Sequence, residues 1–152
     1  MMNDTGEIVG PGAIVTRLLG EFAARVPVWS VTAFTVDGYV VGNKLSEDRI
    51  PETVAPVISS MSAGLITIAE DFIRLVDGAK VFGQILVDSR DAQGGLAFSI
   101  ILRHVAQNLL LSCIFPHSTP LGLVTFEIET LCQELSEAVR GWDTKLHEQS
   151  LT

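Results

Sequence analysis

The chain has 152 residues, a length that fits one domain with a substantial hydrophobic core. Hydrophobic residues make up 47% of the sequence and charged residues 18%, which excludes an intrinsically disordered chain. The formal net charge of −8 repels phosphate backbones, so nucleic acid is not expected as a partner.

The sequence carries no pattern typical of secretion or membrane insertion. Its first residues are polar and acidic, unlike a secretory signal, and the uncharged stretches 53–69 and 104–126 are interrupted by proline and polar residues. Cys113 and Cys132 lie in apolar segments and are expected to be buried free thiols, which suits a reducing compartment. The sequence therefore predicts a cytoplasmic protein without direct membrane insertion.

The chain is predicted to hold one domain over residues 11–142, between a flexible tail at 1–10 and a polar tail at 143–152. Apolar residues at helical spacing predict a helix over 12–25, which Pro27 ends. The segment 28–36 is rich in β-branched and aromatic residues and predicts a strand. A second strand is expected at 39–41, after a type I′ hairpin turn at Asp37-Gly38.

A long helix is predicted over 51–76, although Pro56 lies close to its start. Its main apolar stripe follows steps of three and four: Val54, Val57, Ile58, Met61, Leu65, Ile68, Phe72 and Val76. Amphipathic helices bury such a stripe, so Leu65 and Phe72 are expected to face the sheet.

A second stripe of smaller residues runs beside the first: Ala55, Ser59, Ser62, Ile66, Ala69 and Ile73. Small residues at this spacing let another helix approach closely. The stripe is therefore predicted to be the contact between the middle helices of two copies of the chain. The alternative is a helix buried on two sides within its own domain.

The remaining segments predict three strands, at 80–87, 96–105 and 109–115, and a last helix that begins at Thr119-Pro120 with threonine as its N-cap. No helix-length segment separates these strands, which favours an antiparallel meander. The fold class is α+β: a five-stranded antiparallel sheet sandwiched by three helices, in three layers.

No catalytic, cofactor or metal site is predicted. The glycines form neither a dinucleotide-binding nor a phosphate-binding loop. Cys113 and His117 are the one close cysteine–histidine pair, and structural metal sites usually need four ligands. Asp88 and Asp91 are interpreted as a solvated turn. Strand residues Ser30, Ser112 and Cys113 do not sit on a nucleophile elbow, so no catalytic triad is indicated.

The order of predicted elements resembles the roadblock family, named for the dynein light-chain roadblock proteins, in its prokaryotic form. Three local features carry the resemblance: Val36-Asp37-Gly38 at the hairpin, the apolar helix 51–76, and Leu121-Gly122-Leu123-Val124 before the last helix. The resemblance covers about residues 12–140. It implies that the three layers have the roadblock/profilin-like arrangement.

The resemblance implies a homodimer in which central helices pack together and third strands join two sheets into one. It also implies a scaffold or regulator of a Ras-like small GTPase that supplies no catalytic residue of its own, since a bacterial polarity protein of this type acts in that way. The alternatives are a ligand-sensing module of profilin-like fold, a structural subunit of a larger assembly, or an enzyme with an unrecognised site.

Overall fold

The computed structural model describes residues 10–150, of which 141–150 are described by their backbone alone. The expected tail at 1–10 therefore lies, apart from Gly10, outside the described residues. The helices and strands follow in this order: α1 (Pro11–Arg25), β1 (Ser30–Thr35), β2 (Val40–Leu45), a short 3₁₀ helix η1 (Glu52–Val54), α2 (Ala55–Val76), β3 (Gln84–Arg90), β4 (Leu96–Ala106), β5 (Leu109–Pro116) and α3 (Leu121–Ser150).

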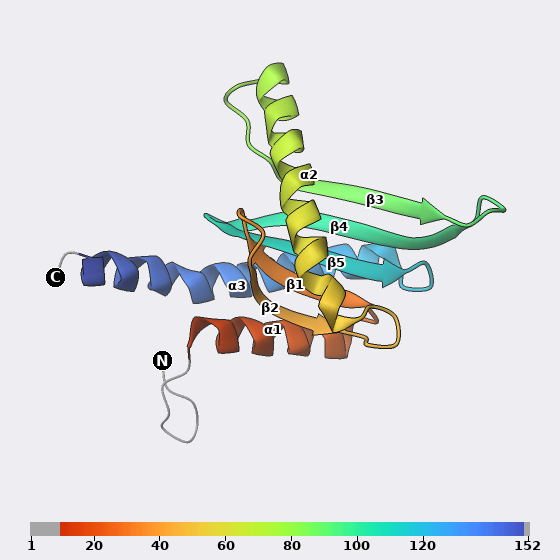
Figure 1. Cartoon of the computed structure of the whole chain (residues 1–152), viewed down its shortest axis with the longest axis horizontal. Coiled ribbons are helices and arrows are strands. Elements are labelled where there is room, and N and C mark those ends of the chain that lie inside the picture. The colour runs from red at the N-terminus through yellow and green to blue at the C-terminus, as the bar shows by residue number, and fades with distance from the viewer. Residues whose placement is uncertain (1–9, 151–152) are drawn as a thin grey trace.

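The five strands form one sheet in the order β2-β1-β5-β4-β3, and every neighbouring pair is antiparallel (Figure 1). β5 lies at the centre, where its residues from Leu109 to Phe115 are all buried. β2 and β3 are the two edge strands. The predicted fold class, a five-stranded antiparallel sheet with helices on both faces, is confirmed.

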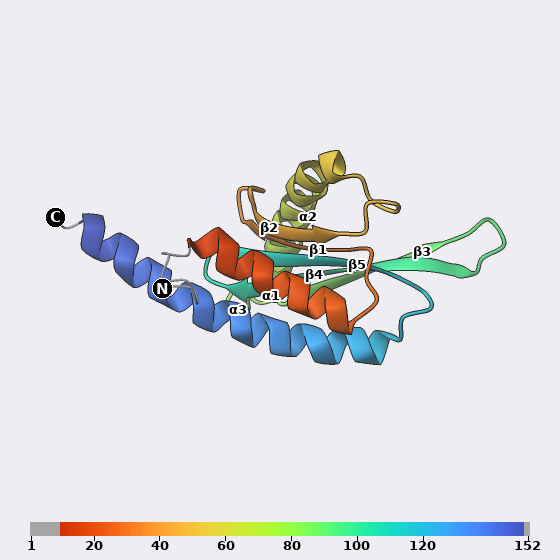
Figure 2. The same ribbon diagram turned by 90° about the horizontal axis from the view of Figure 1, so that it is seen from below.

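The helices divide unequally between the two faces of the sheet. α1 and α3 lie side by side on one face, and α2 lies alone on the other (Figure 2). The core between α1, α3 and the sheet is the larger one, built from residues such as Leu19, Phe22 and Leu131 that are fully buried. An ion pair between Arg25 and Glu127, 3.2 Å apart, joins the surfaces of α1 and α3.

The core under α2 is smaller and contains Phe34, Ala63, Ile66, Phe82, Leu102 and Leu110. This difference means that α2 has less apolar contact with its own domain than α1 and α3 have. Buried apolar area is the main source of tertiary stability, so α2 is the more weakly held layer.

The hairpin between β1 and β2 differs from the predicted turn type. Gly38 has a φ of +89°, but Asp37 is not in the left-handed region, so the turn is not type I′. Instead, Gly38 N–H donates to the Thr35 carbonyl at 2.8 Å, and Thr35 N–H donates to the Tyr39 carbonyl at 2.9 Å. The predicted role of Gly38 as the residue with positive φ is confirmed.

Three helix ends also differ from the prediction. α2 begins at Ala55 after the 3₁₀ turn, so Pro56 lies in its first turn, where proline is tolerated. The Thr119 hydroxyl donates to the Pro27 carbonyl at 2.7 Å, which ties the start of α3 to the end of α1 instead of forming the predicted cap. α3 continues through Gly141 to Ser150, so most of the predicted tail at 143–152 is helical backbone.

The packing of α1 on β2 gives the first prediction. A Cβ at Gly42 would lie 2.8 Å from Thr16 Oγ1 and 3.2 Å from the Thr16 backbone nitrogen. Gly42→Ala should therefore lower the free energy of unfolding by about 1–3 kcal/mol in a denaturant titration. Gly20→Ala is the matched control, because nothing lies within 4 Å of its Cβ position.

Gly20→Ala should raise stability by about 0.5–1 kcal/mol, since alanine favours a helix interior over glycine. Equal effects of the two substitutions would contradict the close approach of α1 to β2.

Candidate protein-interaction surface

The side of α2 that faces the sheet carries the stripe of smaller residues. Ala55, Ser59, Ser62 and Ile66 are each 5% exposed or less, and Ala69 and Ile73 are partly buried against the same core. The prediction that this stripe contacts a second copy of the chain was wrong, because these residues already pack inside their own domain. The alternative, a helix buried on two sides within its own domain, is right for this stripe but wrong for the other one, which is exposed.

The opposite side of α2 carries the large apolar residues and is open to solvent. We call it the α2 outer face, and it consists of Val57, Met61, Leu65, Ile68, Phe72 and Leu75, which are 48–86% exposed. The expectation that Leu65 and Phe72 face the sheet was therefore also wrong. The sequence found both stripes but reversed their assignments.

Close packing explains why the smaller residues face inward. The hairpin glycine approaches α2 so closely that a Cβ on Gly38 would lie 3.1 Å from the Cα of Ser60. The sheet beneath contributes large side chains, including Phe34 and Leu102. Small residues on the helix leave room for both, whereas the side chains of Met61 or Phe72 would hold the helix away from the sheet.

Hydroxyl groups also line this contact. Ser59 on α2, Ser30 on β1 and Ser112 on β5 are buried, and none of their side-chain oxygens has a hydrogen-bond partner among the described residues. A buried hydroxyl without a partner costs free energy. The sheet-facing side of α2 is thus less apolar than the side exposed to solvent.

Strand β3 extends the exposed surface to the edge of the sheet. No strand in the described part of the chain pairs with its outer edge, and Leu86 and Val87 are 43% and 39% exposed. Val87 lies on the α2 side of the sheet, because it follows Ile85 by two residues and Ile85 packs with the core under α2. Open apolar edges of this kind favour strand pairing with another chain.

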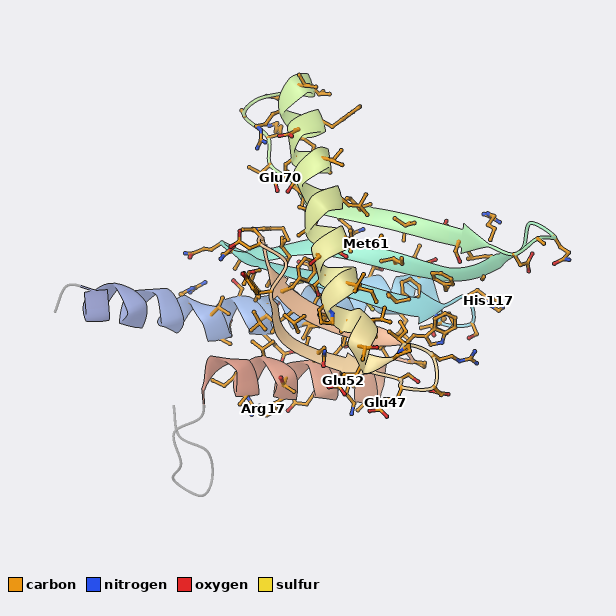
Figure 3. All side chains as sticks on the ribbon, viewed as in Figure 1. Arg17, Glu47, Glu52, Met61, Glu70 and His117 are labelled. Atoms are coloured by element: carbon orange, nitrogen blue, oxygen red, sulfur yellow. The ribbon has the colours of Figure 1, made fainter. Side chains whose placement is uncertain are left out.

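The last turns of α2 project past β3, beyond the sheet that supports the first turns (Figure 1). Phe72, Leu75 and Val76 lie on this projecting part and are 69–86% exposed, and Val81 in the following segment is 87% exposed. In Figure 3, Met61 marks the part of α2 that crosses the sheet, and Glu70 lies where the projecting part begins. The sequence predicted neither the projection nor the exposure of Val81, since both depend on where the sheet ends.

The residues considered for catalysis or metal binding are occupied by structural roles. Asp88 lies in β3 instead of the predicted turn and accepts a hydrogen bond from the Ser99 hydroxyl at 2.8 Å. Asp91 lies in the turn and accepts two hydrogen bonds from backbone N–H groups there. Burial raises the pKa of the Cys132 thiol to about 11, and it raises the pKa of Cys113 as well. Neither thiol is a ready nucleophile at neutral pH, because the reactive form is the thiolate.

Within residues 10–140, no group of three or more histidine, cysteine or acidic side chains is placed to hold a metal ion. Cys113 is buried in the sheet, whereas His117 follows the end of β5, so the pair does not form the start of such a group. His147 lies in the segment described by its backbone alone.

Four arginines on different parts of the chain each make a contact within it. Arg49 stacks over the Trp29 ring at 5.3 Å, and Arg74 pairs with Asp71. Arg90 donates to the Gly94 carbonyl at 3.0 Å, and Arg103 pairs with Glu129. These contacts hold the guanidinium groups on the surface of their own domain.

Comparison with solved structures supports the fold. The gliding protein MglB from Thermus thermophilus matches with a TM-score of 0.76 at 14% identity, over 89% of this chain and 95% of that one. An MglB with tetrameric arrangement matches with a TM-score of 0.73 at 13% identity, over 89% of this chain and 94% of that one. A Roadblock/LC7 domain from Streptomyces avermitilis matches with a TM-score of 0.67 at 14% identity, over 85% of this chain and 97% of that one.

These matches show that the chain has the fold of bacterial MglB and Roadblock/LC7 domains, as the resemblance in the sequence implied. No protein-family model and no curated protein matches the sequence itself. At this level of identity the likeness concerns the arrangement of the backbone.

The different burial of two isoleucines on α2 gives the second prediction. Ile66 is 2% exposed and Ile68 is 67% exposed. At low protein concentration, Ile66→Ala should lower the free energy of unfolding by about 2–5 kcal/mol, because it leaves a cavity against the sheet. Ile68→Ala should change it by less than about 0.5 kcal/mol. A larger loss for Ile68→Ala in denaturant titrations would reverse the two faces of the helix.

Proposed function

We propose that this protein is a homodimeric interaction module that scaffolds or regulates a Ras-like small GTPase and has no catalytic residue of its own. The observation that carries the proposal is the α2 outer face, a long apolar surface that adjoins the open edge of β3. Soluble proteins rarely leave a continuous apolar surface of this kind without a partner.

A second copy of the chain fits this surface better than other partners. A two-fold axis beside β3 would pair the two β3 strands and place the projecting turns of each α2 over the other protomer's sheet. The same residues would then be buried in both protomers, as a two-fold symmetric interface requires. Phe72 and Leu75 would then be buried against the other protomer, where large apolar side chains contribute most to binding.

A lipid bilayer is the competing partner for α2. The helical segment Glu52–Val76 is long and apolar enough, by length and composition, to cross a membrane. However, Ser59 and Ser62 on its inner side are packed on the chain's own sheet, and a net charge of −8 repels anionic lipid surfaces. Because the inner side of α2 is packed on its own sheet, the helix is not free to cross a bilayer, and a protein partner is favoured.

The GTPase part of the proposal rests on the resemblance to the roadblock family together with the shared fold. The intrachain contacts of Arg49, Arg74, Arg90 and Arg103 support a mode of action without an arginine finger. A module of this kind changes a GTPase's rate by stabilising the competent arrangement of its switch loops. Its place of action is the cytoplasm, where such GTPases bind nucleotide.

The dimer gives the third prediction. Light scattering at micromolar concentration should give a mass about twice that of the 16.4 kDa chain. Phe72→Asp places a carboxylate in the proposed interface and should raise the dimer dissociation constant by a factor of about 100 or more. A monomeric wild-type protein across the micromolar range would remove the basis for this interface.

Phe126 provides the matched control, because it is as exposed as Phe72, at 69%, but lies on α3 at the opposite face of the sheet. Phe126→Asp should leave the dimer intact. If Phe126→Asp alone separated the protomers, the interface would lie on α3.

The fourth prediction concerns nucleotide hydrolysis. The purified protein should hydrolyse neither GTP nor ATP, because its sequence has no phosphate loop and its described side chains include no group suited to hold the metal ion of a triphosphate. A GTPase recovered with it from native lysate should hydrolyse GTP at a different rate when the protein is present, measured by phosphate release.

Separate replacement of Arg49, Arg74, Arg90 and Arg103 by alanine should preserve this effect. An arginine variant that still binds the GTPase but lowers its turnover by about a thousandfold would instead show a finger mechanism.

A further inference from the structure

A cavity of about 230 Å³ lies beside the second half of α2, at the end of the sheet where β1 and β4 finish. It is distinct from the α2 outer face. Glu70, which lines it, follows Met61 by nine residues, and about 100° per residue places the two on opposite sides of the helix. Figure 3 shows Glu70 on the flank of α2 that faces the returning segment 77–83.

The inner wall of the cavity is apolar. Phe82 and Leu110 form its floor and are 6% and 2% exposed, and both belong to the core under α2. Val36 and Val81 line its rim and are largely exposed. The volume exceeds the roughly 150 Å³ of a cavity that holds benzene and is below the roughly 300 Å³ of small drug sites. It therefore fits about one aromatic ring with a short chain.

The polar side chains that line the cavity are those of Glu70, His104 and Gln107. Glu70 contributes the one carboxylate among the described residues that line the cavity. Arg74 forms a long ion pair with it, with Nη1 3.9 Å from Oε2, and also hydrogen-bonds to Asp71. His104 Nε2 lies 3.1 Å from the Gln107 carbonyl oxygen, so Nε2 carries the proton, and in the neutral ring Nδ1 is an acceptor. A carboxylate above an apolar floor complements a positively charged donor on an apolar body.

We propose that this cavity binds a small organic cation, a primary amine carried on an apolar group about the size of one aromatic ring. The ammonium pairs with the Glu70 carboxylate, and the apolar group packs on Phe82 and Leu110. The charge-assisted hydrogen bond to the Glu70 carboxylate provides the selectivity for the amine over a neutral analogue.

A ligand bound in this cavity would affect the proposed interface through α2. Its lining joins α2 through Glu70 to the ends of three strands through Val36, His104 and Leu110. A bound amine would therefore add contacts between the sheet and the helix that carries the outer face. The binding itself does not depend on the proposed function and is measured on the isolated protein.

Phenethylamine is the probe, titrated into the full-length protein by isothermal titration calorimetry, with 2-phenylethanol as the neutral analogue of the same shape. Phenethylamine should bind at millimolar concentration or below, and the alcohol at least about tenfold more weakly. Absence of binding by the amine, or equal binding of amine and alcohol, would overturn the proposal.

Glu70→Gln removes the charge and keeps the shape of the side chain, so it should weaken amine binding at least about tenfold. Glu52→Gln is the control, because it removes the same charge from the exposed turn before α2, outside the cavity. Val36→Trp at the rim should block entry. Amine binding that is equal in the Glu70→Gln and Glu52→Gln proteins would place the amine elsewhere and refute the assignment.

Discussion

The close contact between α2 and the sheet is the constraint on which the other features of the surface depend. The hairpin at Gly38 and large sheet residues such as Phe34 occupy the space beneath the helix, so its inner side must be small. Ala55, Ser59 and Ser62 meet that requirement. The large apolar side chains of α2 are consequently on the solvent side, where only a contact with another molecule can bury them.

This arrangement distributes stability unequally over the molecule. α1 and α3 share an extensive apolar core with one face of the sheet, whereas α2 rests on a smaller core that includes buried hydroxyls without partners among the described residues. Burying the α2 outer face in a dimer would add apolar contact to the layer that has least of it. Folding of α2 and association of the protomers are thus expected to support each other.

Much of the fold could be predicted from the sequence, because it depends on local patterns. Proline and glycine set the limits of α1 and the first hairpin, and the β-branched segments indicated the strands in the correct order. Details that depend on distant residues were not predictable in the same way. The Thr119 hydroxyl bonds to Pro27 instead of capping α3, and Asp37 does not take the backbone angles of a type I′ turn.

Local patterns were enough to establish that the middle helix has two apolar stripes and that the chain forms an antiparallel sheet between helices. The packed fold was needed to show which stripe of α2 faces outward, that α2 projects past β3, and that Glu70, Phe82, His104 and Leu110 line one cavity. The physical reason is that periodicity reports which residues share a side of a helix. Which side turns inward depends on the space that the rest of the fold leaves, and that space is formed by residues far away in the chain.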